Sequence, residues 1–210
     1  VDGSFKFRKI LAGLEYSLEY EKPVKGDPVS MAYEFLELNK EKLGMKNPRE
    51  ELVHQGTLPG GSGVRRLSFG QTYNGLGIRE AGIRVFFTSE GEIQEIDGRY
   101  YYDINLPSIY SVDSMSAVQI ALNDVKLTPN PITICPSKPI IVSSSTLPLQ
   151  EENRLYIVWP IQIRPEHTSR FVYIYYIDAL NGNIIIKGRD SSLRSPWPKD
   201  FPPVPVPGPK

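Results

Sequence analysis

The strongest constraint on the fold is a pair of alternating segments on either side of an Asn-Gly dipeptide. In residues 64–73 the larger side chains Leu67, Phe69, Gln71 and Tyr73 alternate with small or polar ones, and a second strand-like segment follows at residues 78–88. Asn74 and Gly75 lie between them, and this dipeptide favours the tight turn with positive φ at both central positions that joins antiparallel strands. The sequence therefore predicts an antiparallel hairpin here.

Further strands are predicted on both sides of this hairpin. Residues 14–21 alternate apolar and polar side chains, as a half-buried strand does. Residues 92–98 and 100–102 also suit strands, and we expect glycine turns at Glu90–Gly91 and at Asp97–Gly98. Consecutive tyrosines in the last of these strands place rings on both faces of the sheet.

A helix is predicted over residues 28–43. Asp27 is a favourable N-cap, Pro28 suits the first helical position, and Gly44 lies where a glycine C-cap belongs. Apolar residues recur at helical spacing within this segment: Met31, Ala32, Phe35, Leu36 and Leu43. One face of the helix must therefore be covered, and we expect a sheet to cover it.

The same order of helix and then strands recurs in the second half. Residues 111–114 open a helix whose expected apolar stripe consists of Met115, Val118, Ala121, Leu122 and Val125. Four strands are expected after it, at residues 140–142, 155–163, 171–179 and 183–187. Asn181–Gly182 predicts a hairpin between the last two.

Two similar small units therefore account for most of the chain. We predict an α+β protein with domains at residues 1–107 and 108–193, followed by a Pro-rich tail at residues 194–210. Prolines remove backbone donors, so the tail suits an extended polyproline conformation. Residues 60–63, which are Gly-Gly-Ser-Gly, read as a flexible connector.

Charge and hydropathy exclude or disfavour several classes of function. The 210 residues carry 24 basic and 24 acidic side chains, so no net charge attracts nucleic acid. No apolar run reaches the 18 or so residues that a membrane-spanning helix needs. The first residues do not resemble a signal peptide, and we expect the natural N-terminus to be missing.

No catalytic or metal-binding constellation is visible. The two histidines, His54 and His167, are more than a hundred residues apart, whereas a thermolysin-type zinc site requires two histidines four residues apart on a helix. The single cysteine, Cys135, can form no internal disulfide, and an inert buried thiol is its simplest interpretation. We therefore expect no enzyme activity, no cofactor and no metal.

The central hairpin resembles a known propeptide family. Gln71, Tyr73, Gly75 and Ile78 match a Q-x-Y-x-G-x-x-[VI] motif, and it is followed by the acidic-Gly turns described above. This run is similar to the propeptides of thermolysin-like and fungalysin-like zinc metalloproteases. In that family the element belongs to a non-catalytic module that helps the enzyme to fold and holds it inactive.

The second half resembles the PepSY domain, which follows the first module in the same propeptides. The resemblance rests on the aromatic strands at residues 155–161 and 171–179 and on the turn that carries Asp178 and Gly182. Asn181 replaces the usual threonine, and a Pro- and Ser-rich insertion occupies residues 129–149. Together the two resemblances span roughly residues 31–188.

The resemblance implies a fold and a role. It implies two cystatin-like units, each a curved antiparallel sheet packed on one helix. It also implies a secreted, periplasmic or cell-surface module that binds a thermolysin-like metalloprotease, in cis or in trans, as inhibitor and folding assistant. Two alternatives remain open: a stand-alone secreted or cell-envelope binding or adhesion domain with no protease client, and a small-molecule binder that uses the concave face of a sheet.

Overall fold

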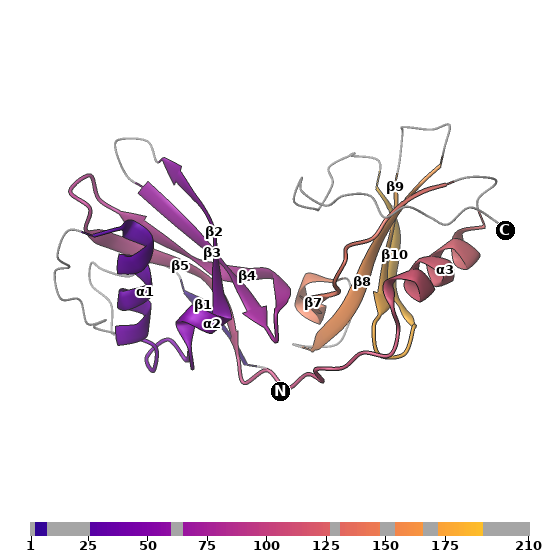
Figure 1. The fold of residues 1–210 in the computed structure, drawn as a ribbon, viewed down its shortest axis with the longest axis horizontal. Coiled ribbons are helices and arrows are strands. Elements are labelled where there is room, and N and C mark those ends of the chain that lie inside the picture. The colour runs from indigo at the N-terminus through magenta and orange to yellow at the C-terminus, as the bar shows by residue number, and fades with distance from the viewer. Residues whose placement is uncertain are drawn as a thin grey trace. The chain divides into compact units, whose positions relative to one another are not determined.

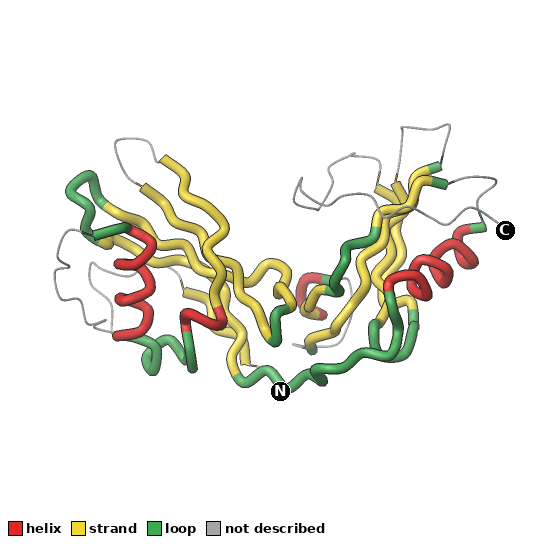
Figure 2. The backbone as a smooth tube through the Cα atoms, viewed as in Figure 1, coloured by secondary structure: helices red, strands yellow, loops and turns green. Residues whose placement is uncertain are grey.

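The chain has a mixed α+β architecture in which strands predominate. The computed structural model describes residues 3–7, 26–59, 65–126, 131–147, 154–165 and 172–190. Figure 2 shows the contrast between the many strands and the few short helices. Contacts divide the chain into two compact units: the first covers Val1–Asn105 and Glu151–Arg154, and the second covers Leu106–Gln150 and Leu155–Lys210.

The first unit is built on an antiparallel sheet of five strands. These are β1 (Gly3–Phe7), β2 (Leu52–Pro59), β3 (Arg65–Tyr73), β4 (Leu76–Phe87) and β5 (Ile93–Tyr102), in the spatial order β1-β5-β4-β3-β2. The predicted hairpin is confirmed, because β3 and β4 pair up to Tyr73 and Leu76 on either side of the turn. Neither β1 nor β2 was expected from the sequence.

The turn predicted at Asp97–Gly98 is wrong. Both residues lie inside β5, which runs without interruption from Ile93 to Tyr102. A Cβ atom on Gly98 would lie 2.1 Å from the carbonyl oxygen of Gly82 on the neighbouring strand. The glycine is therefore required for the close approach of two strands, and the local sequence could not distinguish this role from a turn.

The first helix begins as predicted and ends earlier. Helix α1 spans Pro28–Leu38, and the Asp27 carboxylate accepts a hydrogen bond from the Ser30 N–H at 3.0 Å. Hydrogen-bonded turns follow α1 instead of the expected helix to residue 43. They end in a glycine cap, with Gly44 at φ +69° and the Met45 N–H bonded to the Lys40 carbonyl at 2.8 Å.

One face of α1 and one face of the sheet form the core of the first unit, and Figure 1 shows α1 beside the strands of this sheet. The helix contributes Met31, Ala32, Phe35 and Leu36, and the sheet contributes Leu52, Leu67, Phe69, Ile83, Val85, Phe87, Ile93, Ile96 and Tyr100. A one-turn helix α2 (Pro48–Glu51) leads into β2. The expectation that a sheet covers the first helix is thus confirmed.

The second unit also contains one α-helix and antiparallel strands. Its elements are α3 (Ser114–Val125), β6 (Ile132–Ile134), β7 (Ile140–Ser143), the 3-10 helix η2 (Ser144–Thr146), β8 (Leu155–Arg164), β9 (Val172–Asp178) and β10 (Ile184–Asp190). Strands β6 and β7 both pair with β8, which pairs with β9, and β9 forms the predicted hairpin with β10. Strand β6 lies in the Pro- and Ser-rich insertion and was not expected.

The apolar stripe predicted for the second helix is partly wrong. Helix α3 contacts β8 and β9, and the side chains that it buries completely are Ala117 and Ala121. Met115, expected in the stripe, is 54% exposed. Small alanines allow the helix to approach the large residues of the strands closely, whereas the sequence pattern favoured the larger side chains.

Three expectations lie outside the described residues. They are the strand at residues 14–21, the connector at residues 60–63 and the Pro-rich tail at residues 194–210.

Candidate functional site

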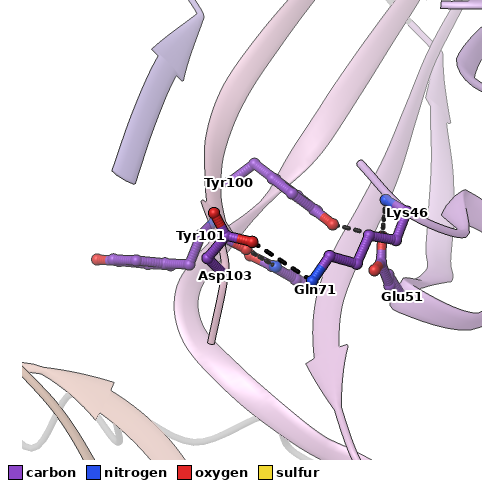
Figure 3. A network of polar contacts seen from close by, with 6 residues as sticks. All are labelled: Lys46, Glu51, Gln71, Tyr100, Tyr101 and Asp103. Atoms are coloured by element: carbon purple, nitrogen blue, oxygen red, sulfur yellow. Dashed lines mark hydrogen bonds and ion pairs between the residues drawn. The ribbon is translucent and has the colours of Figure 1, made fainter. Parts of the chain in front are cut away.

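The residues on which the propeptide resemblance rests stabilise the fold, and Gln71 is the clearest case. Gln71 on β3 is 2% exposed, and its side-chain amide meets the backbone of Tyr101 on β5. The Gln71 Oε1 atom accepts from the Tyr101 N–H at 2.8 Å, and Nε2 donates to the Tyr101 carbonyl oxygen at 2.5 Å. Figure 3 shows this double contact. One side chain therefore satisfies two backbone groups 30 positions away.

The strand register explains why a side chain makes this link. Pairing of β3 with β4 passes directly from Gly70 opposite Gly82 to Thr72 opposite Gly77. Gln71 therefore lies opposite a bulge in β4, where that strand carries extra residues. The amide reaches past this bulge to the backbone of β5, beyond the last paired residues of the β4–β5 ladder.

A second polar cluster lies beside Gln71 in Figure 3. The Tyr100 hydroxyl donates to the Glu51 carboxylate, which also accepts from the Lys46 N–H at 3.3 Å. Burial and the adjacent Glu51 carboxylate hold the pKa of Tyr100 well above its usual range. The Lys46 ammonium forms an exposed ion pair with Asp103 at 3.3 Å. These contacts link the α2 region to the end of β5.

A small cavity adjoins this cluster. Its volume is about 60 Å³, and Glu51, Gln71, Tyr100 and Asp103 are among the residues that line it. Such a space is large enough for a few water molecules.

The other signature residues of the first unit shape the β3–β4 hairpin. Asn74 and Gly75 have φ values of +50° and +74°, as a two-residue hairpin turn requires. Tyr73 pairs with Leu76 across the turn and is half-buried. Ile78 is 5% exposed. These positions fix the strand pair, and nothing in their geometry marks a reactive group.

Asp178 and Gly182 have the corresponding role in the second unit. The Asp178 carboxylate accepts from the Leu180 N–H at 2.7 Å and from the Asn181 amide at 3.2 Å. The Gly182 N–H donates to the Asp178 carbonyl at 2.9 Å, and Gly182 has φ +78°. The six signature residues therefore form no single site, because four organise the first unit and two organise the β9–β10 turn.

The groups expected to be chemically inert are placed as follows. The His54 ring on β2 lies beside Phe69, and its Nε2 atom is 3.3 Å from the Thr57 hydroxyl. His167 lies outside the described residues. Burial raises the pKa of the Cys135 thiol to about 12, so the thiol stays protonated at neutral pH. Within the described ranges, no three His, Cys, Asp or Glu side chains are grouped so that they could hold a metal ion.

A larger hollow lies on the first unit's sheet and was not expected from the sequence. Its volume is about 590 Å³, and we call it the sheet hollow. The polar side chains that line it are Gln55, Ser68, Glu80, Arg84, Asp97 and Arg99. They come from four strands, so no local motif could reveal them. Gly82 and Gly98 also line the hollow. The sequence pattern at Gly98 favours a turn, so it does not indicate the hollow.

The described helices include none that is both long and apolar enough to cross a membrane.

Comparisons with known proteins show a weak structural likeness. No family model matches the chain, and no curated protein matches it. Among solved structures, the chain is similar to the Bacillus megaterium YpeB C-terminal domain, with 14% sequence identity and a TM-score of 0.33. The alignment covers 83% of this chain and 69% of that chain.

Proposed function

We propose that the chain is a non-catalytic module that binds a secreted thermolysin-like metalloprotease and inhibits it or assists its folding. The partner would act in cis or in trans, and the module would be secreted, periplasmic or on the cell surface. Inhibition would arise from surface burial, with sheet edges and loops occluding a cleft and no covalent step.

The role of Gln71 is the observation that carries this proposal. Its amide closes the gap between β3 and β5 at the bulge in β4, through both backbone groups of Tyr101. A glutamine at this place in the Q-x-Y-x-G motif thus has a specific structural reason. This supports the propeptide resemblance. In a module without catalytic residues, we expect the signature residues of the family to stabilise the fold.

The architecture of each unit gives further support. The first unit packs α1 on one face of an antiparallel sheet, and the second packs α3 against β8 and β9. We infer that both units are of the cystatin-like kind, in which one helix packs on a curved antiparallel sheet. In such a unit the edge strands and connecting loops are the elements available to a partner.

Strand β2 is the edge that we expect a protease to contact. Among the described strands β2 pairs with β3 alone, so one row of its backbone groups has no ladder partner. Val53 and Leu58 on this strand are each 51% exposed. Unpaired backbone with exposed apolar side chains is what strand addition to a partner uses.

Inhibition assays test the proposal. A purified thermolysin-like protease, and its counterpart from the source organism, would be titrated with the chain while its integrity is followed on gels. We expect saturable inhibition by uncleaved chain, or a higher yield when the denatured protease refolds with the chain present. Lysine at both Val53 and Leu58 should weaken the effect at least about tenfold, since it places charges in an apolar contact.

Leu38→Lys is the matched control, because Leu38 is also 51% exposed but belongs to α1 and not to β2. If the chain neither inhibits nor assists refolding and is digested as a substrate, the proposal fails. The stand-alone envelope-binding domain would then be the better hypothesis.

A further inference from the structure

We propose that the sheet hollow binds an extended peptide segment and that the Arg99 guanidinium holds an acidic side chain of that peptide. The site would lie on the sheet face that bears Ser68, Arg84 and Asp97, and α1 packs on the other face. This inference does not depend on a protease client.

Glycines let the strands beneath the hollow lie close together. Gly70 pairs with Gly82 across β3 and β4, and Gly98 follows on β5. A Cβ atom on Gly82 would lie 2.1 Å from the Phe69 carbonyl oxygen, and one on Gly98 would lie equally close to that of Gly82. The place of a Cβ on Gly70 is filled by the Gln55 amide. Close packing of three strands therefore forms the floor of the hollow.

Arg99 is the cation available to a ligand. Arg84 on the neighbouring strand already has a carboxylate partner, because its guanidinium binds Asp97. Within the part of the chain that the structure describes, the Arg99 side chain has no hydrogen bond or ion pair, and it lines the hollow. A guanidinium presents a fork of donors that matches a carboxylate.

One unusual feature accompanies the hollow. Glu80, which lines it, has φ +59°, a conformation that residues other than glycine rarely adopt and that recurs at binding sites.

The size and the neutral groups of the hollow favour a peptide over a small anion. A volume of about 590 Å³ lies within the range of ligand pockets and far exceeds the needs of one carboxylate. The Gln55 amide and the Ser68 hydroxyl can each donate and accept, as the main chain of an extended peptide requires. We therefore assign the hollow to a peptide, with the acidic side chain as anchor.

Fluorescence anisotropy with defined peptides tests this assignment. A fluorescein-labelled peptide of eight residues, with glutamate alternating with serine and threonine, would be titrated with the intact chain, alongside the same peptide with glutamine for glutamate. We expect the acidic peptide to bind at least about tenfold more tightly. Arg99→Gln should remove most of this difference, and 300 mM salt should reduce it.

Arg164→Gln is the control variant, because Arg164 is exposed on β8 and is not among the residues that line the hollow. Circular dichroism and the unfolding midpoint would establish that both variants are folded. Equal affinity for the two peptides, or an Arg99→Gln variant that binds as the wild type does, would overturn the proposal. Displacement of the peptide by citrate at equal concentration would also overturn it, since a free anion would then suffice.

Discussion

The Gln71 side chain and the Tyr101 backbone form a closed pair of hydrogen bonds, at 2.8 Å and 2.5 Å, between strands that are not neighbours in the sheet. Strand β4 lies between them, and its bulge leaves the space that the amide fills. The first unit is therefore held at this point by a side chain where a backbone ladder is interrupted. Both groups are buried, so the contact is costly to lose.

Replacing Gln71 with leucine should destabilise the first unit by about 3 kcal/mol. The change leaves the Tyr101 N–H and carbonyl without their partner, and an unsatisfied buried polar group costs about 1–3 kcal/mol. Urea unfolding would measure the loss. Gln94→Leu is the matched control, since Gln94 is exposed on β5 and its change should cost less than about 0.5 kcal/mol. Equal losses for the two variants would refute the structural role.

Gly98 and Gly77 should respond differently to alanine. A Cβ on Gly98 meets the Gly82 carbonyl oxygen at 2.1 Å, whereas nothing lies within 4 Å of a Cβ on Gly77. We expect Gly98→Ala to cost more than about 3 kcal/mol or to prevent folding, because backbone must move. Gly77→Ala should change stability by no more than about 1 kcal/mol. Thermal unfolding of both variants would decide, and a mild effect at Gly98 would contradict the close approach of β4 and β5.

Gly182 makes the corresponding prediction for the second unit. Its φ of +78° is unfavourable for alanine, and a Cβ there would lie 3.1 Å from the Ile120 Cδ1 atom. We expect Gly182→Ala to cost about 1–2 kcal/mol. Gly188→Ala, with open space around the added atom and no positive φ, serves as the control. The urea midpoints of the two variants should therefore separate, and a Gly182 variant as stable as the Gly188 variant would show that the turn tolerates a side chain.

Tyr100 should make the stability of the protein sensitive to alkaline pH. The pKa of Tyr100 is raised in the folded state, first by burial and then by its bond to Glu51. A raised folded pKa means that the protonated form contributes stability below the unfolded pKa of about 10, and that this contribution is lost as pH rises further. The difference in unfolding free energy between wild type and Tyr100→Phe should therefore shrink from pH 9 to pH 11. If the difference in unfolding free energy between wild type and Tyr100→Phe stays constant over this pH range, the pKa of the Tyr100 hydroxyl is not raised by folding.

Local signals predicted the turns well and the long-range contacts poorly. Asn74–Gly75 was predicted because positive φ at two successive residues is a property of the dipeptide itself. Asp97–Gly98 was misread as a turn, because a glycine that admits a neighbouring strand has the same sequence as one that turns the chain. The sheet hollow was not predicted, because Arg99, Ser68 and Gln55 are brought together only by the order of the strands.

Periodicity, turn dipeptides and helix caps in the sequence determined the elements: the strand pair at Asn74–Gly75, the start of α1 at Asp27 and the hairpin near Gly182. These features are local, because they depend on backbone preferences of a few adjacent residues. The tertiary structure alone decided that Gln71 would bind Tyr101 and that Arg99 would line a hollow. Both results depend on strand order and on a bulge, which bring together residues that are far apart in the chain. A single sequence contains no direct signal for such long-range contacts.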